Sequence, residues 1–165
     1  MKNTKLNIFA GINGAGKSTL HKILNKNCFG LCIETLLCDS SILNLLKETK
    51  EKGIFIELFY VGVASSDIAV KRVQQREQKG RHRINAELVE KRYENSQGDL
   101  KLIFDLWDVV HFYDNTISMN EVCFIKGNKI VCRYNMLEWD NNSNLCWLKN
   151  LINSIYGNLK WQILV

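Results

Sequence analysis

The fold is decided by a stretch near the start of the chain, Leu6-Asn7-Ile8-Phe9-Ala10-Gly11-Ile12-Asn13-Gly14-Ala15-Gly16-Lys17-Ser18-Thr19. Its second half fits G-x-x-x-x-G-K-[ST], the phosphate-binding loop, whose glycines let backbone amides wrap closely around a polyphosphate. The apolar residues before the loop predict a short buried strand, and Leu20, Ile23 and Leu24 recur behind it at helical spacing. Strand, glycine loop and helix together predict a nucleotide-binding site.

The residues of the loop have distinct chemical tasks. Residues 11–19 are expected to cradle nucleotide phosphates at the positive end of the dipole of the following helix. Lys17 supplies a mobile cation for the β- and γ-phosphates, and the Ser18 hydroxyl can ligate Mg²⁺. A dinucleotide-binding loop is disfavoured because no third glycine follows Gly14 and Gly16 at the required spacing. ATP and Mg²⁺ are the expected cofactors.

Length and composition limit the class of protein. The 165 residues, 46% of them hydrophobic, predict a single domain over residues 1–165 with one core. No apolar run approaches a membrane span and the start of the chain has no signal-peptide core, so we expect a cytoplasmic protein without a membrane partner. Six cysteines include no C-x-x-C pair, which favours reduced, buried cysteines over a metal site or disulfides.

Strand and helix patterns alternate through most of the chain. The apolar spacing predicts strands over 6–10, 31–35, 54–63 and 108–113, and helices over 16–26, 40–52, 66–78 (with Ser66 as N-cap) and 86–106. Gly127-Asn128 is the turn signal of a hairpin over about 121–134, and a helix is expected over about 143–157. This order predicts an α/β fold of the P-loop kinase type, a mostly parallel sheet with helices on both faces.

Carboxylates at strand ends are the candidates for the metal side of the site. Glu34 ends a strand that is expected to neighbour the loop strand, at the edge where open α/β sheets bind ligands. It is the candidate for a metal-binding and catalytic role beside Ser18, although a solvent-facing strand-end Glu is the structural alternative. Asp39 is a weaker candidate. Asp114-Asn115 could lie near the nucleotide base or assist the metal, or simply form a turn.

The net charge of +5 is concentrated in residues 71–92, a block that suits an anionic partner. Arginine donates in a fixed fork, which suits a γ-phosphate in transfer. Arg76 and Arg92 are the catalytic candidates, and Arg72 and Arg81 the nucleotide-binding ones. Arg81, His82 and Arg83 could form a loop that closes over the nucleotide. Charged helices are also often only solvated faces.

Together these residues resemble the zeta toxin family of P-loop kinases. The likeness spans residues 5 to about 139 and rests on Ala10-Gly11-Ile12-Asn13-Gly14-Ala15-Gly16-Lys17-Ser18-Thr19, Glu34-Thr35-Leu36, Gly53, Ile56-Glu57-Leu58-Phe59-Tyr60-Val61-Gly62-Val63, Arg72-Val73-x-x-Arg76, Gly80-Arg81-His82, Arg92-Tyr93 and Asp114-Asn115. The resemblance implies a kinase that uses ATP and Mg²⁺ to phosphorylate the sugar 3′-hydroxyl of UDP-N-acetylglucosamine. Some such proteins are toxins held by a small helical antitoxin, whereas this short chain looks more like chromosomal relatives.

The chain departs from the family pattern in two places. Family members carry an Asp one segment after the loop helix, as base on the acceptor hydroxyl, but nothing acidic lies between Lys17 and Glu34. Compared with the family pattern, a whole strand–helix unit is missing, since the first helix is expected to pass almost directly into the strand that holds Glu34-Thr35, and in the usual kinase topology this unit is a sheet edge. Relatives also show Gly-Gly-His where this chain has Gly80-Arg81-His82. Loss of a general base typically costs about 10²- to 10⁴-fold in rate.

Three functions follow from these features. The first is an active kinase of a sugar-nucleotide, and the second is a degenerate relative that binds ATP without efficient transfer. The third, an enzyme or binder of nucleic acid that uses the basic segment, is disfavoured because the chain lacks a recognisable nucleic-acid module.

Overall fold

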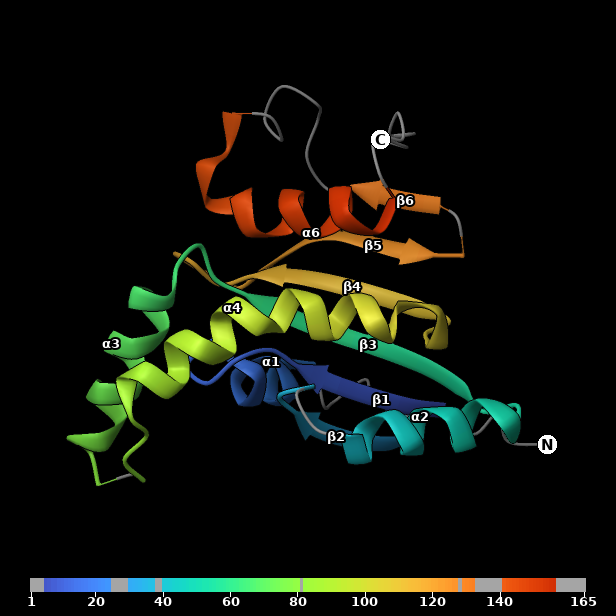
Figure 1. The fold of residues 1–165 in the computed structure, drawn as a ribbon, viewed down its shortest axis with the longest axis horizontal. Helices are drawn as coiled ribbons and strands as arrows, with labels where there is room; N and C mark the ends of the chain where they lie inside the picture. The colour runs from blue at the N-terminus through green and yellow to red at the C-terminus, as the bar shows by residue number, and fades with distance from the viewer. Residues whose placement is uncertain are drawn as a thin grey trace.

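The computed structural model describes residues 5–24, 30–37, 40–80, 82–127, 129–132 and 141–156. Within them the strands are β1 (Lys5–Ala10), β2 (Leu31–Thr35), β3 (Phe55–Gly62), β4 (Val109–Asp114), β5 (Asn120–Lys126) and β6 (Lys129–Cys132). They form one sheet in the order β2-β1-β3-β4-β5-β6 (Figure 1). The first four strands of this order are parallel, and β5 and β6 are antiparallel additions. The predicted neighbourhood of the Glu34 strand and the loop strand is confirmed.

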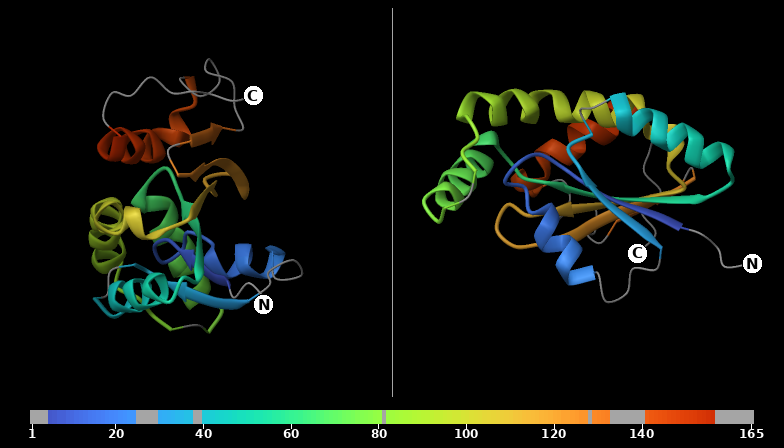
Figure 2. Two further views of the ribbon diagram at one scale, coloured as in Figure 1. Left: turned by 90° about the vertical axis from the view of Figure 1, so that its right-hand side faces the viewer. Right: turned by 90° about the horizontal axis from the view of Figure 1, so that it is seen from below.

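Helices cover both faces of this sheet. They are α1 (Lys17–Leu24), α2 (Ser40–Glu51), α3 (Ser66–Glu77), α4 (Ala86–Leu102) and α6 (Cys146–Tyr156), with short 3₁₀ turns η2 (Phe104–Leu106) and η3 (Ser143–Leu145). Figure 2 shows α2, α4 and α6 on one face and α1 on the other. Because parallel strands need crossover helices, this layering follows from the alternation in the sequence and confirms the predicted α/β fold.

Two apolar clusters fill the space between the layers. The larger one packs side chains of α2, α4 and α6, such as Leu46, Leu100 and Leu148, on one sheet face. The smaller one packs Leu20 of α1 and Val73 of α3 with strand residues beside the loop. The glycine loop thus lies at the smaller cluster, while most of the buried apolar residues belong to the larger one.

Two predicted helix boundaries are wrong. Ser65, and not Ser66, occupies the N-cap position of α3, and its side chain makes no capping hydrogen bond. The helix expected to reach Leu106 ends at Leu102, before η2. The early end of α4 has a tertiary cause. Asp108 exchanges hydrogen bonds with the backbone of Ile56 near the start of β3, so the chain must turn before it enters β4 beside β3.

Other expectations have mixed outcomes. The predicted hairpin is present as β5 and β6, although residues 128 and 133–134 lie outside the described residues. Cys123 and Cys132 are buried as expected, whereas Cys146 is exposed at the start of α6. No helix among the described residues combines the length and apolarity needed to cross a bilayer. The single domain over residues 1–165 stays a prediction.

The connection between α1 and β2 is only six residues long, 25–30. It is too short for a strand and a helix, since a crossover unit needs about 10–12 residues or more. Among the described strands, β2 consequently forms one edge of the sheet.

Candidate functional site

The glycine loop joins β1 to α1 at the carboxyl edge of the parallel strands. Gly11 has φ +137°, and a Cβ there would lie 2.3 Å from the carbonyl oxygen of Val61 on β3. Gly16 has φ +115°, and its Cβ would lie 2.4 Å from the Asn115 side-chain nitrogen. Only glycine satisfies both the backbone conformation and the space at these positions, because other residues disfavour positive φ and carry a Cβ. The loop is therefore shaped by its neighbours on β3 and after β4.

Lys17 begins α1 and reaches back over the loop. Its Nζ donates to the carbonyl oxygens of Gly11 at 2.7 Å and Ile12 at 3.1 Å. The first amides of a helix have no partner within it, so the start of α1 offers N–H donors beside this ammonium. A cation and helix amides at one point are a suitable setting for phosphate.

Glu34, at the carboxyl end of β2, lies opposite the first turn of α1. The Ser18 hydroxyl donates to its Oε2 at 2.8 Å, and His21 Nδ1 lies 3.1 Å from its Oε1. Register explains this placement, because Glu34 pairs with Phe9 in the strand that leads into the loop. A hydroxyl and a carboxylate oxygen therefore meet at the edge of the loop.

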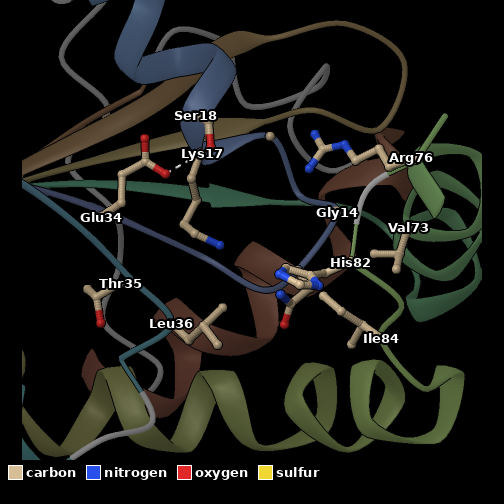
Figure 3. Close-up of a pocket in the computed structure, with 13 residues that line it drawn as sticks. Gly14, Lys17, Ser18, Glu34, Thr35, Leu36, Val73, Arg76, His82 and Ile84 are labelled. Atoms are coloured by element: carbon tan, nitrogen blue, oxygen red, sulfur yellow. Dashed lines mark hydrogen bonds between the residues drawn. The ribbon is translucent and has the colours of Figure 1, made fainter.

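These groups open on a pocket of about 820 Å³, within the range of small-molecule sites (Figure 3). It is lined by Asn13, Gly14, Gly16, Lys17, Ser18, Glu34, Thr35, Leu36, Val73, Arg76, Gly80, His82 and Ile84. Among the described lining residues, Lys17 and Arg76 carry positive charge and Glu34 is the only acidic one. The pocket therefore favours an anion, with one carboxylate beside it.

The pocket has two kinds of wall. Lys17, Ser18 and Glu34 form a polar side next to the loop, and Arg76 and His82 approach from α3 and the residues after it (Figure 3). The apolar part of the lining comes from residues on three different segments, Leu36, Val73 and Ile84. This division suits a ligand that has charged phosphates at one end and a less polar body at the other.

The other predicted residues hold the loop from outside the pocket lining. Arg92 of α4 donates to the Asn13 side chain at 2.6 Å. Asn115, directly after β4, donates from Nδ2 to the Ala15 carbonyl oxygen at 2.7 Å. These two contacts support the loop from α4 and from the end of β4, so both side chains can position it.

Arg72 and Asp114 also turn away from the pocket lining. Arg72 donates to the Thr116 carbonyl oxygen at 3.2 Å, and its NH1 is buried with no hydrogen-bond partner among the described residues. Burial and the nearby charge of Arg76 lower the pKa of Arg72, against the opposing influence of Asp114. The Asp114 carboxylate accepts from Thr116 and from the Trp147 indole at 3.1 Å. Asp114 thus shapes the turn and ties it to α6.

Two predicted residues, Arg81 and Asp39, lie outside the described residues. In the same basic loop, Arg83 is largely exposed and pairs with Glu77 at 3.4 Å. Sequence reasoning missed His21 and the apolar wall. The sequence did hold a signal for His21. It lies three residues after Ser18, a candidate metal ligand, and residues three apart share a helix face.

The donor atoms at the loop fit Mg²⁺. Ser18 and Glu34 offer oxygen ligands, and their oxygens lie 2.8 Å apart. No cluster of three His, Cys, Asp or Glu side chains suited to a metal occurs in the described part of the chain. Mg²⁺ needs none in such sites, because it is commonly held by one or two protein oxygens together with substrate phosphates and water.

The chain is similar to a known protein in part of its sequence and to a solved structure in its fold. No protein family model matches it. It is 32% identical over 68 residues, 41% of its length, to an uncharacterized protein of Haemophilus influenzae, of which it spans only about half, 49%. Its structure is similar to one from the PezAT chromosomal toxin–antitoxin system of Streptococcus pneumoniae, with a TM-score of 0.54 and 12% identity. That match covers 98% of this chain and 82% of the other.

At 12% identity the structural match concerns the fold alone. It extends over nearly the whole chain and includes the layers that carry the glycine loop. The chain therefore has a mostly parallel α/β fold that is similar, over nearly its whole length, to the fold of that structure.

Proposed function

We propose that this chain binds ATP with Mg²⁺ and transfers the γ-phosphate to a hydroxyl of a sugar-nucleotide. One observation carries the proposal: Lys17, Ser18, Glu34 and Arg76 line a single pocket at the carboxyl edge of the sheet. They are the groups that phosphoryl transfer needs, because the transferring group passes through a state with charge spread over its oxygens. UDP-N-acetylglucosamine is the proposed acceptor, on the resemblance alone.

The charged, hydroxyl and apolar side chains of the lining have different tasks in this proposal. Lys17 and the start of α1 bind the β- and γ-phosphates, and Arg76 neutralises charge on the phosphoryl group in transfer. Ser18 and Glu34 would hold Mg²⁺, which would supply charge neutralisation for the phosphates in transfer. The apolar wall of Leu36, Val73 and Ile84 excludes water from the reacting groups.

Phosphoryl transfer also needs a group that accepts the proton of the acceptor hydroxyl, and the pocket supplies this group least well. Glu34 is the only carboxylate among the described lining residues, and its two oxygens already contact Ser18 and His21. A carboxylate committed to the metal is a poor base. This observation favours a second candidate function, a protein that binds ATP and turns it over slowly or not at all.

One experiment separates the two candidates. The full chain is mixed with ATP, Mg²⁺ and UDP-N-acetylglucosamine, and mass spectrometry follows phosphorylated sugar-nucleotide while calorimetry measures ATP binding. Lys17→Ala is the control and should lose both. Product with the wild-type chain supports the kinase, and binding without product supports the second candidate. No heat with ATP would overturn both.

Two further proposals are coarser. A small antitoxin is proposed as a protein partner, on the resemblance and on the toxin–antitoxin origin of the similar structure. Co-purification of the tagged chain with the product of an adjacent gene tests it. A cytoplasmic location stays a prediction.

A further inference from the structure

His21 lies beside the proposed magnesium site without lining the pocket. It follows Ser18 by three residues on α1, so both side chains project from one face of the helix toward Glu34. Ser18 Oγ contacts Oε2 of the carboxylate, and His21 Nδ1 contacts Oε1. Each oxygen of Glu34 is thus held by a different residue of the same helix.

The imidazole ring is itself held in place. It stacks on Phe9 with ring centroids 4.5 Å apart and an interplanar angle of 27°. Phe9 is completely buried and stacks in turn on Phe59 of β3 at 4.9 Å. The orientation of His21 is therefore set by the sheet beneath it, and Nδ1 is directed at Glu34 by rigid neighbours.

The contact between His21 and Glu34 has the geometry of a hydrogen bond. An ionised carboxylate only accepts hydrogen bonds, so the His21 tautomer with a proton on Nδ1 is the one that donates to Oε1. The donated hydrogen bond fixes the rotation of the carboxylate about its last torsion, which is otherwise broad for Glu.

Glu34 needs such support more than a buried residue would. Its side chain is 33% exposed, and β2 is an edge strand among the described strands. An exposed carboxylate at the end of an edge strand loses conformational freedom when it binds a metal, and that loss weakens binding. A group that orients the carboxylate beforehand reduces this cost.

We propose that His21 is a positioning residue that orients the Glu34 carboxylate for magnesium-dependent nucleotide binding, an inference that rests on the proposed function. His21 is not among the residues that line the pocket. Its effect passes through Oε1 of Glu34, and Oε2, which contacts Ser18, is the oxygen that would ligate the metal.

The test uses two variants, one of which keeps the aromatic ring and the other the hydrogen-bond donor of the imidazole. His21→Phe keeps a ring over Phe9 and removes the donor. His21→Asn places an amide nitrogen near the position of Nδ1 and removes the stacking ring. The probe is a fluorescent ATP analogue, and its binding to the full chain is measured against MgCl₂ concentration and again in excess EDTA.

His21→Phe is expected to raise the Mg²⁺ concentration for half-maximal binding by about tenfold, at the lower end of the effect of residues that orient metal ligands. Its affinity in EDTA should match the wild type. His21→Asn should recover most of the magnesium dependence. Lys22→Ala, an exposed neighbour on α1, is the matched control and should behave as wild type.

Three results would overturn the proposal. His21→Phe could require no more Mg²⁺ than the wild type, or it could lose affinity equally in EDTA, which indicates a merely structural part. His21→Asn could also fail as badly as His21→Phe. Failure of the proposed function is distinguishable, since the wild-type chain would then show no magnesium-dependent binding of the analogue at all.

Discussion

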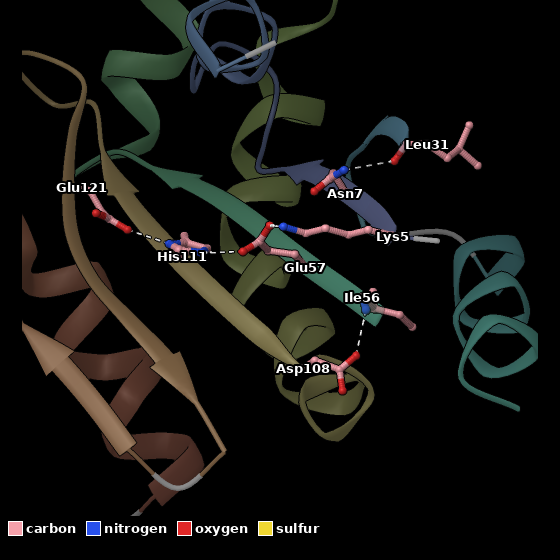
Figure 4. Close-up of polar contacts among 8 residues, drawn as sticks. All are labelled: Lys5, Asn7, Leu31, Ile56, Glu57, Asp108, His111 and Glu121. Atoms are coloured by element: carbon pink, nitrogen blue, oxygen red, sulfur yellow. Dashed lines mark hydrogen bonds and ion pairs between the residues drawn. The ribbon is translucent and has the colours of Figure 1, made fainter. Parts of the chain in front are cut away.

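Two histidines lie along one aromatic row on the sheet, and their surroundings differ. His21 stacks on Phe9, and His111 of β4 stacks on Phe59 at 4.9 Å with an interplanar angle of 8°. His21 meets one carboxylate, at the rim of the pocket. His111 lies between two carboxylates, with Nδ1 2.6 Å from Glu121 and Nε2 3.0 Å from Glu57 (Figure 4).

The second cluster consists of Lys5, Glu57, His111 and Glu121, which pair with one another away from the pocket, and is called the closed cluster below. Glu57 also pairs with Lys5, so the cluster connects β1, β3, β4 and β5 through side chains alone (Figure 4). None of its members lines the pocket. The difference teaches that a histidine–glutamate pair on this sheet indicates a binding site only where the carboxylate also faces a cavity, as Glu34 does.

The protonation of the closed cluster reflects this arrangement. Burial by itself would lower the pKa of His111, but hydrogen bonds to Glu121 and Glu57 outweigh burial and raise it above 6.5. Burial likewise opposes ionisation of Glu57, yet hydrogen bonds from His111 and Lys5 leave its pKa below 4.5. The charged forms are therefore the stable ones on both sides of the contact.

Glu34→Gln and Glu57→Gln give the largest contrast between the clusters. Glu34→Gln removes a charged ligand of the proposed metal, so we expect magnesium-dependent ATP affinity to fall by about 10- to 100-fold. Glu57→Gln is a matched control that should leave ATP affinity unchanged and lower the melting temperature. Calorimetry with ATP and Mg²⁺ measures the first effect. Equal losses of affinity in both variants would remove the distinction between the clusters.

His111→Gln should destabilise the fold without touching the site. It leaves the Glu57 and Glu121 carboxylates near each other without the charged ring between them, and we expect the free energy of unfolding to fall by about 2 kcal/mol. Urea unfolding gives this value. His82→Gln is the same change at an exposed pocket residue, and it should leave stability unaffected. A stable His111→Gln protein would mean that the cluster adds nothing to the fold.

The pH dependence of stability should follow the closed cluster. A raised histidine pKa contributes stability that is complete below its unfolded value of 6.5 and is lost as the pH rises through the folded value. The lowered pKa of Glu57 contributes stability that is complete above 4.5 and is lost on acidification. We expect the cluster to stabilise the chain most between these two values. The free energy of unfolding is measured for the wild type and for His111→Gln at pH 6 and at pH 8.5. The difference between the two proteins should be smaller at pH 8.5.

The smallest expected effect tests how far the site extends beyond the pocket. Asn115→Ala removes one hydrogen bond to the loop at Ala15, which is worth about 1 kcal/mol, or about fivefold in affinity. Because the contact is to the loop backbone, ATP and GTP should be affected equally. Competition binding with both nucleotides measures this. A loss confined to one nucleotide would assign Asn115 to the base instead.

Much of the fold could be predicted from local patterns. Alternating apolar runs and glycine signals located the strands and most helices, because the periods of strand and helix are properties of a short segment. The end of α4 could not be predicted this way. It depends on Asp108 meeting Ile56, residues far apart in the chain.

In the candidate site too, some residues could be predicted from local sequence and others could not. Lys17, Ser18 and Glu34 were predicted because a motif and a strand end place them directly. Among the arginines, the sequence offered several equivalent candidates. Arg76 lines the pocket, whereas Arg72 and Arg92 contact the turn after β4 and the side chain of Asn13.

By itself, the sequence determined the glycine loop, the carboxylate at the end of the neighbouring strand and the short connection between α1 and β2, since each is a matter of residue type and spacing. Only the tertiary structure decided which cations reach the pocket, that Asn115 supports the loop, and that His21 joins the site while His111 does not. The physical reason is that side-chain direction depends on strand register and on how each helix packs on the sheet, and both are set by contacts between distant segments.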